Sequence, residues 1–320
     1  MSLRIVFMGT PEFAVASLDI LIKNNFNVVG VVSVPDKPAG RGQQIQQSAI
    51  KKYAVEHNLK LLQPDKLKDE NFINELKNLQ ADLQLVVAFR MLPELVWHMP
   101  KMGTYNLHAS LLPKYRGAAP INWAIINGEQ ESGVTTFKLK HEIDTGNILF
   151  QEKVNIEPTT TAGELHDKLM LVGADLILKT VQEIEAGFIK GSELNFLPQD
   201  NSLACHAPKI FKEDCLIDWG KTAKEINNLI HGLSPYPTAY SQLKNGDDAI
   251  QLVKIFNSKY EVFTPNNPNG LLLTDNKNYL KVYCEDGLIE ITEIQLQGKK
   301  KISIKEFLRG FIVKDKAMFI

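Results

Sequence analysis

The chain has 320 residues, enough for two domains, and its 44% hydrophobic and 23% charged residues are typical of a globular protein. A net charge of −1 excludes a strong overall attraction to nucleic acid, and no apolar run reaches the ~18 residues of a membrane helix. Three cysteines cannot all pair and no signal peptide is evident, so we expect a cytoplasmic protein. The spacing of Cys205, His206 and Cys215 matches no standard zinc site, so we expect no metal. We also expect a monomer.

The N-terminal part predicts alternating strands and helices. Residues 3–8 and 27–33 are expected strands around one helix, whose apolar face carries Val15, Leu18, Leu21 and Ile22. The turn Gly9-Thr10-Pro11 lacks the Gly-x-Gly-x-x-Gly pattern, so a dinucleotide site is not supported. A further helix is expected over 48–57, with Ser48 as its N-cap.

Residues 34–47 show no periodicity and predict a long loop. The loop carries Lys37 and Arg41 beside Gly40 and Gly42. Long loops are often functional, and cations on a glycine-rich segment can bind phosphates. A solvated surface loop explains the same residues equally well.

Residues 82–88 are almost continuously apolar, as expected of a buried parallel strand. The loop after this strand, Phe89 to Pro93, contains Arg90, Met91 and Leu92. Ligands of open α/β sheets bind outside the carboxyl ends of the strands, so this loop can line a crevice whose backbone holds a flat heterocycle.

The stretch 103–117 carries the strongest candidate for chemistry. Asn106 and His108 lie two apart on a predicted strand and therefore point to one side, while Leu107 points into the core. The turn 142–146 carries Asp144, whose carboxylate can orient the imidazole and raise its pKa. A strand with one polar residue and a satisfied histidine is the alternative.

The following segments predict the end of one domain and the start of another. Capping boxes at Thr161, Thr222 and Ser303 begin three helices, the first running to about residue 186. The polar stretch 188–206 is the expected linker between domains over 1–187 and 207–320. Short segments punctuated by Gly and Asn predict a barrel of the OB type; the expected strands lie near 239 and over 250–256, 279–284 and 288–295.

The motifs resemble those of a known family. Asn-x-His-x-Ser-Leu-Leu-Pro followed by Asp-x-Gly is similar to the signature of the folate-dependent formyltransferases. The resemblance covers nearly the whole chain and includes the segments 8–13, 36–42, 207–210 and 298–301. It implies a Rossmann-like catalytic domain with a mostly parallel sheet, followed by an OB-like domain that binds tRNA.

The resemblance also implies a reaction and its residues. The formyl group of 10-formyltetrahydrofolate passes to the free amine of methionine on initiator tRNA, and no metal is needed. Asn106 and His108 stabilise the oxyanion, and Asp144 orients His108 and favours its charged form. The implied folate-binding residues are Arg90, Met91, Leu92, Ser110, Leu111, Leu112 and Pro113. The implied tRNA-binding residues are Lys37, Arg41, Lys299, Lys300 and Lys301.

Other functions fit parts of the same pattern. A formyltransferase for a small amine, such as glycinamide ribonucleotide or an amino sugar nucleotide, is the alternative, together with a formyltetrahydrofolate hydrolase. An RNA-binding protein without activity would not need Asn106, His108 and Asp144. Ser110 as a nucleophile is disfavoured because the Gly-x-Ser-x-Gly elbow is missing.

Overall fold

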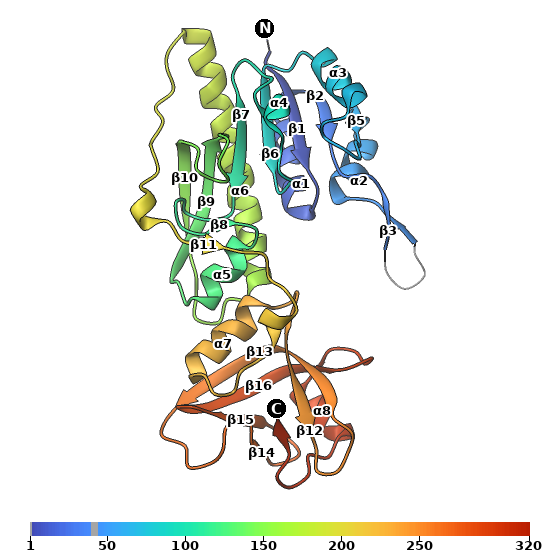
Figure 1. Cartoon of the computed structure of the whole chain (residues 1–320), viewed down its shortest axis with the longest axis vertical. Helices are drawn as coiled ribbons and strands as arrows, with labels where there is room; N and C mark the ends of the chain where they lie inside the picture. The colour runs from blue at the N-terminus through green and yellow to red at the C-terminus, as the bar shows by residue number, and fades with distance from the viewer. Residues whose placement is uncertain (1, 40–43) are drawn as a thin grey trace. The chain divides into compact units, whose positions relative to one another are not determined.

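The computed structural model describes residues 2–39 and 44–320, which form two compact units (Figure 1). The N-terminal unit comprises residues 1–117, 132–154 and 166–206; the C-terminal unit comprises 118–131, 155–165 and 207–320. The C-terminal unit therefore includes two segments from within the predicted catalytic domain of residues 1–187. No helix among the described residues is long and apolar enough to cross a membrane.

The N-terminal unit is built on a seven-stranded sheet in the order β10-β9-β7-β6-β1-β2-β5. The pairs from β7 through β6, β1 and β2 to β5 are parallel, and β9 runs antiparallel to β7. This confirms the predicted Rossmann-like, mostly parallel sheet. Its strands are β1 (Arg4–Gly9), β2 (Asn27–Val32), β5 (Leu61–Leu62), β6 (Leu83–Val87), β7 (Thr104–His108), β9 (Glu131–Lys138) and β10 (Ile148–Asn155).

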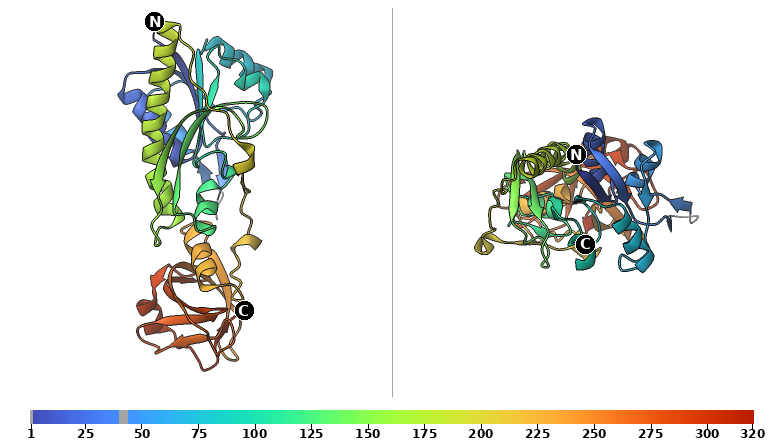
Figure 2. Two further views of the ribbon diagram at one scale, coloured as in Figure 1. Left: turned by 90° about the vertical axis from the view of Figure 1, so that its left-hand side faces the viewer. Right: turned by 90° about the horizontal axis from the view of Figure 1, so that it is seen from above.

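Helices cover both faces of this sheet (Figure 2). On one face, α6 packs so closely on β7 that a Cβ at Gly173 would lie 2.8 Å from Leu107, and the buried hydroxyls of Thr136 and Thr180 are 2.8 Å apart. On the other face, apolar side chains of α3 and α4 pack against β1 and β6. The helices are α1 (Glu12–Lys23), α2 (Ala49–Glu56), α3 (Glu70–Asn78), α4 (Glu94–Trp97) and α6 (Ala162–Lys190).

Local signals place several of these helices. Ser48 accepts a hydrogen bond from the backbone N–H of Lys51, as predicted for the N-cap of α2. On α1 the buried apolar residues are Phe13, Ala14, Leu18 and Leu21, whereas Val15 and Ile22 are only half-buried. The buried face is therefore rotated from the predicted one, because the small Ala14 lies beside Gly9 at the end of β1.

The segment predicted as a loop over 34–47 contains a short antiparallel pair, β3 (Lys37–Ala39) with β4 (Gln44–Gln46). Strands of three residues are too short for an alternating pattern to be recognised in the sequence. Lys37 is exposed on β3. Arg41 lies outside the described residues.

The C-terminal unit holds a second sheet in the order β14-β15-β16-β13-β12-β18, with β17 paired to β16. The N–H of Phe319 donates to Gly270 (2.8 Å) and that of Leu272 to Ala317 (3.0 Å), so the two ends of the sheet meet in a nearly closed barrel. The predicted OB-like barrel is confirmed. Its strands are β12 (Ala239–Lys244), β13 (Gln251–Val262), β14 (Leu272–Thr274), β15 (Leu280–Cys284), β16 (Gly287–Leu296), β17 (Ile302–Ser303) and β18 (Met318–Phe319).

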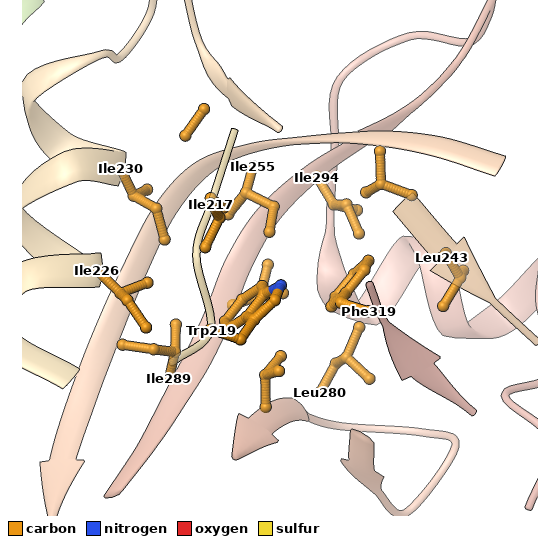
Figure 3. Packing of buried hydrophobic residues seen from close by; sticks show 14 of the residues in the cluster. Ile217, Trp219, Ile226, Ile230, Leu243, Ile255, Leu280, Ile289, Ile294 and Phe319 are labelled. Carbon is orange, nitrogen blue, oxygen red and sulfur yellow. The ribbon is translucent and has the colours of Figure 1, made fainter. Parts of the chain in front are cut away.

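The barrel encloses an apolar core around Trp219 (Figure 3). The Trp219 ring stacks on Phe319 with centroids 5.4 Å apart, and its Nε1–H donates to Ser241 Oγ at 3.0 Å. Helix α7 (Ala223–Gly232) covers the core with Ile226 and Ile230 and begins with the predicted capping box at Thr222. This unit also contains α5 (Pro120–Ile126) and α8 (Ile304–Gly310).

Two short strands, two turns of 3₁₀ helix and one irregular segment complete the described fold. Strands β8 (Arg116–Gly117) and β11 (His206–Ala207) form a two-stranded sheet. Residues 191–205, called the connecting segment here, follow α6 and include one turn of 3₁₀ helix, η1 (Asn201–Leu203). A second such turn, η2 (Glu213–Cys215), follows β11.

Candidate functional site

The sheet register gathers the carboxyl ends of three parallel strands at one edge. Gly9 of β1 pairs with Val87 of β6, and Val87 pairs with Leu107 of β7. The turn after β1, the loop after β6 and His108 at the end of β7 therefore lie at the same edge. In open α/β sheets this is the edge where ligands bind.

His108 and Asp144 meet at this edge. His108 is 6% exposed, and its Nε2 lies 2.8 Å from the carbonyl oxygen of Tyr115, so Nε2 carries the hydrogen and donates it. Its Nδ1 lies 3.8 Å from Asp144 Oδ2, within ion-pair range but beyond a direct hydrogen bond. Asn106, half-buried, leaves β7 on the same side as His108 because Leu107 between them faces α6.

The turn that carries Asp144 is held in an unusual conformation. Asp144 has a φ of +54°, in the left-handed region that few non-glycine residues adopt. Its Oδ2 accepts a hydrogen bond of 2.9 Å from the N–H of Gly117. A Cβ at Gly146 would lie 1.7 Å from the carbonyl oxygen of Lys138, so only glycine fits there. The Asp-x-Gly spacing therefore has a steric cause.

The connecting segment contributes a residue that sequence reasoning missed. Gln199 Nε2 donates to the carbonyl oxygens of Asp144 (2.8 Å) and Gly146 (2.7 Å). Its Oε1 accepts from Nε (3.1 Å) and a terminal nitrogen (2.6 Å) of Arg116. No motif marks Gln199, which lies in a polar stretch that predicts only a linker.

The loop after β7 is stabilised by its own polar groups. Ser110 Oγ donates to the carbonyl oxygen of Lys114 (2.6 Å), and Thr135 Oγ1 donates to that of Ser110 (2.6 Å). Thr135 Oγ1 also accepts from the N–H of Leu112 (3.1 Å), and Gln151 Nε2 donates to the Leu112 carbonyl (2.8 Å). Ser110 and Leu112 are buried, whereas Leu111 and Pro113 are half-buried. The Ser110 hydroxyl and the backbone of Leu112 therefore fix the loop, and the Leu112 side chain packs in a buried cluster with Phe137 and Ile148.

The three residues predicted in the loop after β6 have different surroundings. The guanidinium of Arg90 donates to the backbone carbonyls of Pro64 and Asp65, and burial lowers its pKa although nearby Asp65 opposes the shift. Leu92 is buried with the α3 and α4 cluster, whereas Met91 is 75% exposed. Arg90 thus braces two loops.

A cavity of about 350 Å³ lies beside the Asp144 turn. Residues 138–141 and Asn147, which flank the turn, form one wall, and Trp97 of α4 and Phe196 of the connecting segment contribute aromatic rings. Lys138 Nζ stands 6.0 Å from the centre of the Phe196 ring. The cavity combines flat apolar walls with two lysines, Lys138 and Lys140, and one carboxylate, Glu94. None of the predicted folate residues lines it, although Leu92 belongs to the cluster against which Trp97 and Leu139 pack.

The predicted lysine cluster lies in the turn after β16. Lys301 Nζ is 2.9 Å from a carboxylate oxygen of Glu293 and 5.4 Å from the ring centre of Phe256. Lys299 and Lys300 are exposed, and within the described part of the chain neither forms an ion pair. The cluster thus offers two unpaired cations and one paired one.

Comparison with known proteins gives consistent matches over both units. Residues 3–181 match the formyl transferase family model, and residues 209–312 match the model for the formyl transferase C-terminal domain. The chain is 52% identical over 317 residues to a methionyl-tRNA formyltransferase of Bacteroides fragilis, covering 97% of this chain and 95% of that protein. It is 51% identical over 315 residues to one of Flavobacterium johnsoniae, covering 98% of each.

Solved structures share the fold at low sequence identity. A sugar 3N-formyl transferase, solved with dTDP and 5-N-formyl-THF, matches with a TM-score of 0.64 at 24% identity, covering 94% of this chain and all of that one. HypX from Aquifex aeolicus in complex with tetrahydrofolic acid matches with a TM-score of 0.62 at 18% identity, covering 96% of this chain and 47% of that one.

Proposed function

The chain belongs to the methionyl-tRNA formyltransferases, and we propose that the sheet edge with Asn106, His108 and Asp144 carries out their reaction in it. The enzyme transfers the formyl group of 10-formyltetrahydrofolate to the free amino group of methionine on initiator tRNA. A reaction on initiator tRNA serves translation, so we place it in the cytoplasm. The observation that carries the site assignment is the 3.8 Å approach of His108 Nδ1 and Asp144 Oδ2 beside Asn106.

The chemistry needs a stabilised oxyanion and a route for one proton. The amine attacks the formyl carbon, and the carbonyl oxygen of the tetrahedral intermediate becomes negative. The bond from that carbon to the folate nitrogen then breaks, and the proton lost by the amine is returned to this nitrogen. The Asn106 amide is the donor to the oxyanion, an interaction typically worth ~100- to 1000-fold in rate. His108, predicted to share this role, has its Nε2 hydrogen on the Tyr115 carbonyl, so it would donate to the oxyanion only through a protonated Nδ1.

His108 is placed to move the proton. Because Nε2 donates to the Tyr115 carbonyl, Nδ1 is the ring nitrogen that can exchange a proton with a reacting group. At 3.8 Å, Asp144 Oδ2 lies within ion-pair range of Nδ1 but makes no direct hydrogen bond to it, so Nδ1 stays open to a reacting group while the bond from Nε2 to Tyr115 holds the ring. The Asp144 carboxylate is placed to stabilise the ring when Nδ1 carries a proton. Proton transfer by such a group typically contributes ~100- to 10000-fold.

The cavity beside the Asp144 turn supports folate as the formyl donor. Folate is a flat heterocycle with a carboxylate tail, and the walls formed by Trp97, Leu139 and Phe196 suit the ring while Lys138 and Lys140 suit carboxylates. Ser110, Leu112 and Arg90 act by shaping the neighbouring loops. We expect the heterocycle to lie between these loops and the Asp144 turn.

Cations on both units support tRNA as the acceptor. Lys37 is exposed on β3, and Lys299 and Lys300 are exposed after β16. Such side chains neutralise backbone phosphates. Arg41, outside the described residues, is proposed to act with Lys37. Lys301 is proposed as a weaker contact because Glu293 already pairs with it.

Purified protein, 10-formyltetrahydrofolate and methionyl-tRNA test this function together. We expect N-formylmethionyl-tRNA and tetrahydrofolate as products, and no formylation of glycinamide ribonucleotide or an amino sugar nucleotide. Asn106→Ala, His108→Ala and Asp144→Ala should each lower kcat by ~100-fold or more, with the folate dissociation constant little changed. Normal turnover by the His108→Ala protein would refute the site assignment, and release of formate without an acceptor would indicate a hydrolase.

A further inference from the structure

We propose that Gln199 is a positioning residue that sets the Asp144 carboxylate against His108. The proposal deepens the function above and rests on it. Gln199 belongs to the connecting segment, outside every motif that marks the site. Its side-chain amide touches no reacting group and acts through the turn that it holds.

The amide of Gln199 uses its full hydrogen-bonding capacity. Both Nε2 hydrogens go to backbone carbonyls, at 2.8 Å to Asp144 and 2.7 Å to Gly146, and Oε1 accepts twice from Arg116. Turning the amide over would set its oxygen against two carbonyls and its N–H groups against a guanidinium. The partners therefore determine its orientation.

These contacts close a ring of hydrogen bonds. The Asp144 carboxylate accepts from the N–H of Gly117, the guanidinium of the preceding Arg116 binds Gln199, and Gln199 returns to the Asp144 carbonyl. The terminal nitrogen of Arg116 that binds Gln199 also donates to Asn201 Oδ1 at 2.8 Å, so two residues of the connecting segment hold the guanidinium. Asp144 is thus tied to β8 twice, through its side chain and through its backbone.

The Asp144 turn depends on such support. A non-glycine residue at a φ of +54° persists only where its surroundings determine the backbone. The Asp144 and Gly146 carbonyls flank that residue's left-handed turn, and Gln199 binds both of them at once. Without these two bonds, the N–H of Gly117 would still hold the carboxylate, but the backbone of the turn could shift and move the carboxylate relative to His108 Nδ1.

The connecting segment is itself anchored near Gln199. Leu197 and Ile148 exchange two backbone hydrogen bonds of 2.8 Å, and the Cys205 carbonyl accepts from the N–H of Arg116 at 3.0 Å. Cys205 Sγ accepts from the N–H of Tyr115 at 3.2 Å. Gln199 therefore reaches the site from a segment fixed on both sides of it, which suits a positioning role.

Gln199→Glu separates the two halves of the interaction. A glutamate keeps the acceptors for Arg116, so the segment stays in place, but it sets a carboxylate against the carbonyls of Asp144 and Gly146. We expect kcat to fall by ~30- to 100-fold with the KM for folate and for tRNA within about threefold, since small misplacements of catalytic groups have effects of this size. Gln182→Glu, at an exposed site on α6, adds the same charge and should leave kcat unchanged.

A double variant distinguishes positioning from a general structural role. If Gln199 acts through Asp144, adding Gln199→Glu to Asp144→Asn should lower kcat by less than about threefold further. The proposal would be overturned if the losses of kcat from Gln199→Glu and Asp144→Asn multiplied in the double variant. It would also be overturned if Gln199→Glu kept the wild-type kcat, or if Gln182→Glu lost as much kcat as Gln199→Glu. Formylation by the wild-type protein tests the proposed function separately, because these comparisons use only ratios to its rate.

Discussion

The Asp144 turn of the N-terminal unit and the Trp219 core of the C-terminal barrel are held by different interactions. The turn has a left-handed aspartate, a glycine pressed against a carbonyl and polar contacts to Gln199. The core has stacked rings of Trp219 and Phe319 among buried aliphatic side chains. Polar positioning of this kind specifies geometry at little net gain in stability, whereas apolar burial supplies stability. Activity and stability should therefore respond to changes at different places.

Trp219→Ala should have the largest effect on stability. Removing the indole leaves a cavity and a lost hydrogen bond to Ser241, which together cost ~3 to 5 kcal/mol in the unfolding free energy of the C-terminal unit. Urea unfolding followed by circular dichroism measures it. Ile312→Ala, at a residue 76% exposed in the same unit, should cost less than ~0.5 kcal/mol. Equal losses of unfolding free energy in Trp219→Ala and Ile312→Ala would contradict the claim that the Trp219 core stabilises this unit.

Gly146→Ala should lower activity much more than it lowers stability. The added methyl cannot be placed 1.7 Å from the Lys138 carbonyl oxygen, so the turn must shift and carry Asp144 away from His108. We expect kcat to fall by ~100-fold while the unfolding free energy changes less than in Trp219→Ala. Gly310→Ala is the matched control, because a Cβ there meets no heavy atom within 4 Å. Full activity in Gly146→Ala would show that the turn tolerates displacement.

Between pH 7 and 5 we expect stability to depend on pH through His231 of the C-terminal unit. Burial lowers the pKa of His231, although hydrogen bonds to Ser258 and Asn257 oppose the shift. The unfolded chain therefore binds a proton on His231 more readily than the folded chain does. The contribution of His231 to the unfolding free energy is complete at neutral pH and decreases as pH falls below about 6.5, by at most ~1.4 kcal/mol per pH unit. Thermal unfolding between pH 7 and 5 should show this loss, and His231→Gln should flatten it. An equal slope in His231→Gln would assign it elsewhere.

Local patterns were sufficient to predict much of the fold. The capping boxes at Thr222 and Ser303 begin helices as expected, because both partners of each cap lie within four residues. Strand β13 extends to Val262, beyond the predicted end at 256, since its last four residues are exposed and show no alternation. Strand β14, with three half-buried residues, has no detectable period and was not predicted.

The site likewise contains residues that the sequence could predict and contacts that it could not. Asn106 and His108 could be placed on one face from their spacing alone, and Asp144 was suggested by its motif. The contacts of Tyr115 and Gly117 use only backbone groups, which carry no side-chain signal. Gln199 acts across 55 residues of sequence, a distance at which no periodicity applies.

The pairing of β18 has a consequence for synthesis on the ribosome. Phe319 seals the barrel against Gly270 and packs on Trp219, which precedes it by about a hundred residues. Until the final strand leaves the exit tunnel, the ring of Trp219 lacks its stacking partner and the nascent barrel exposes apolar surface. Chaperones that shield nascent chains should therefore engage this part of the molecule until β18 is available to close the barrel.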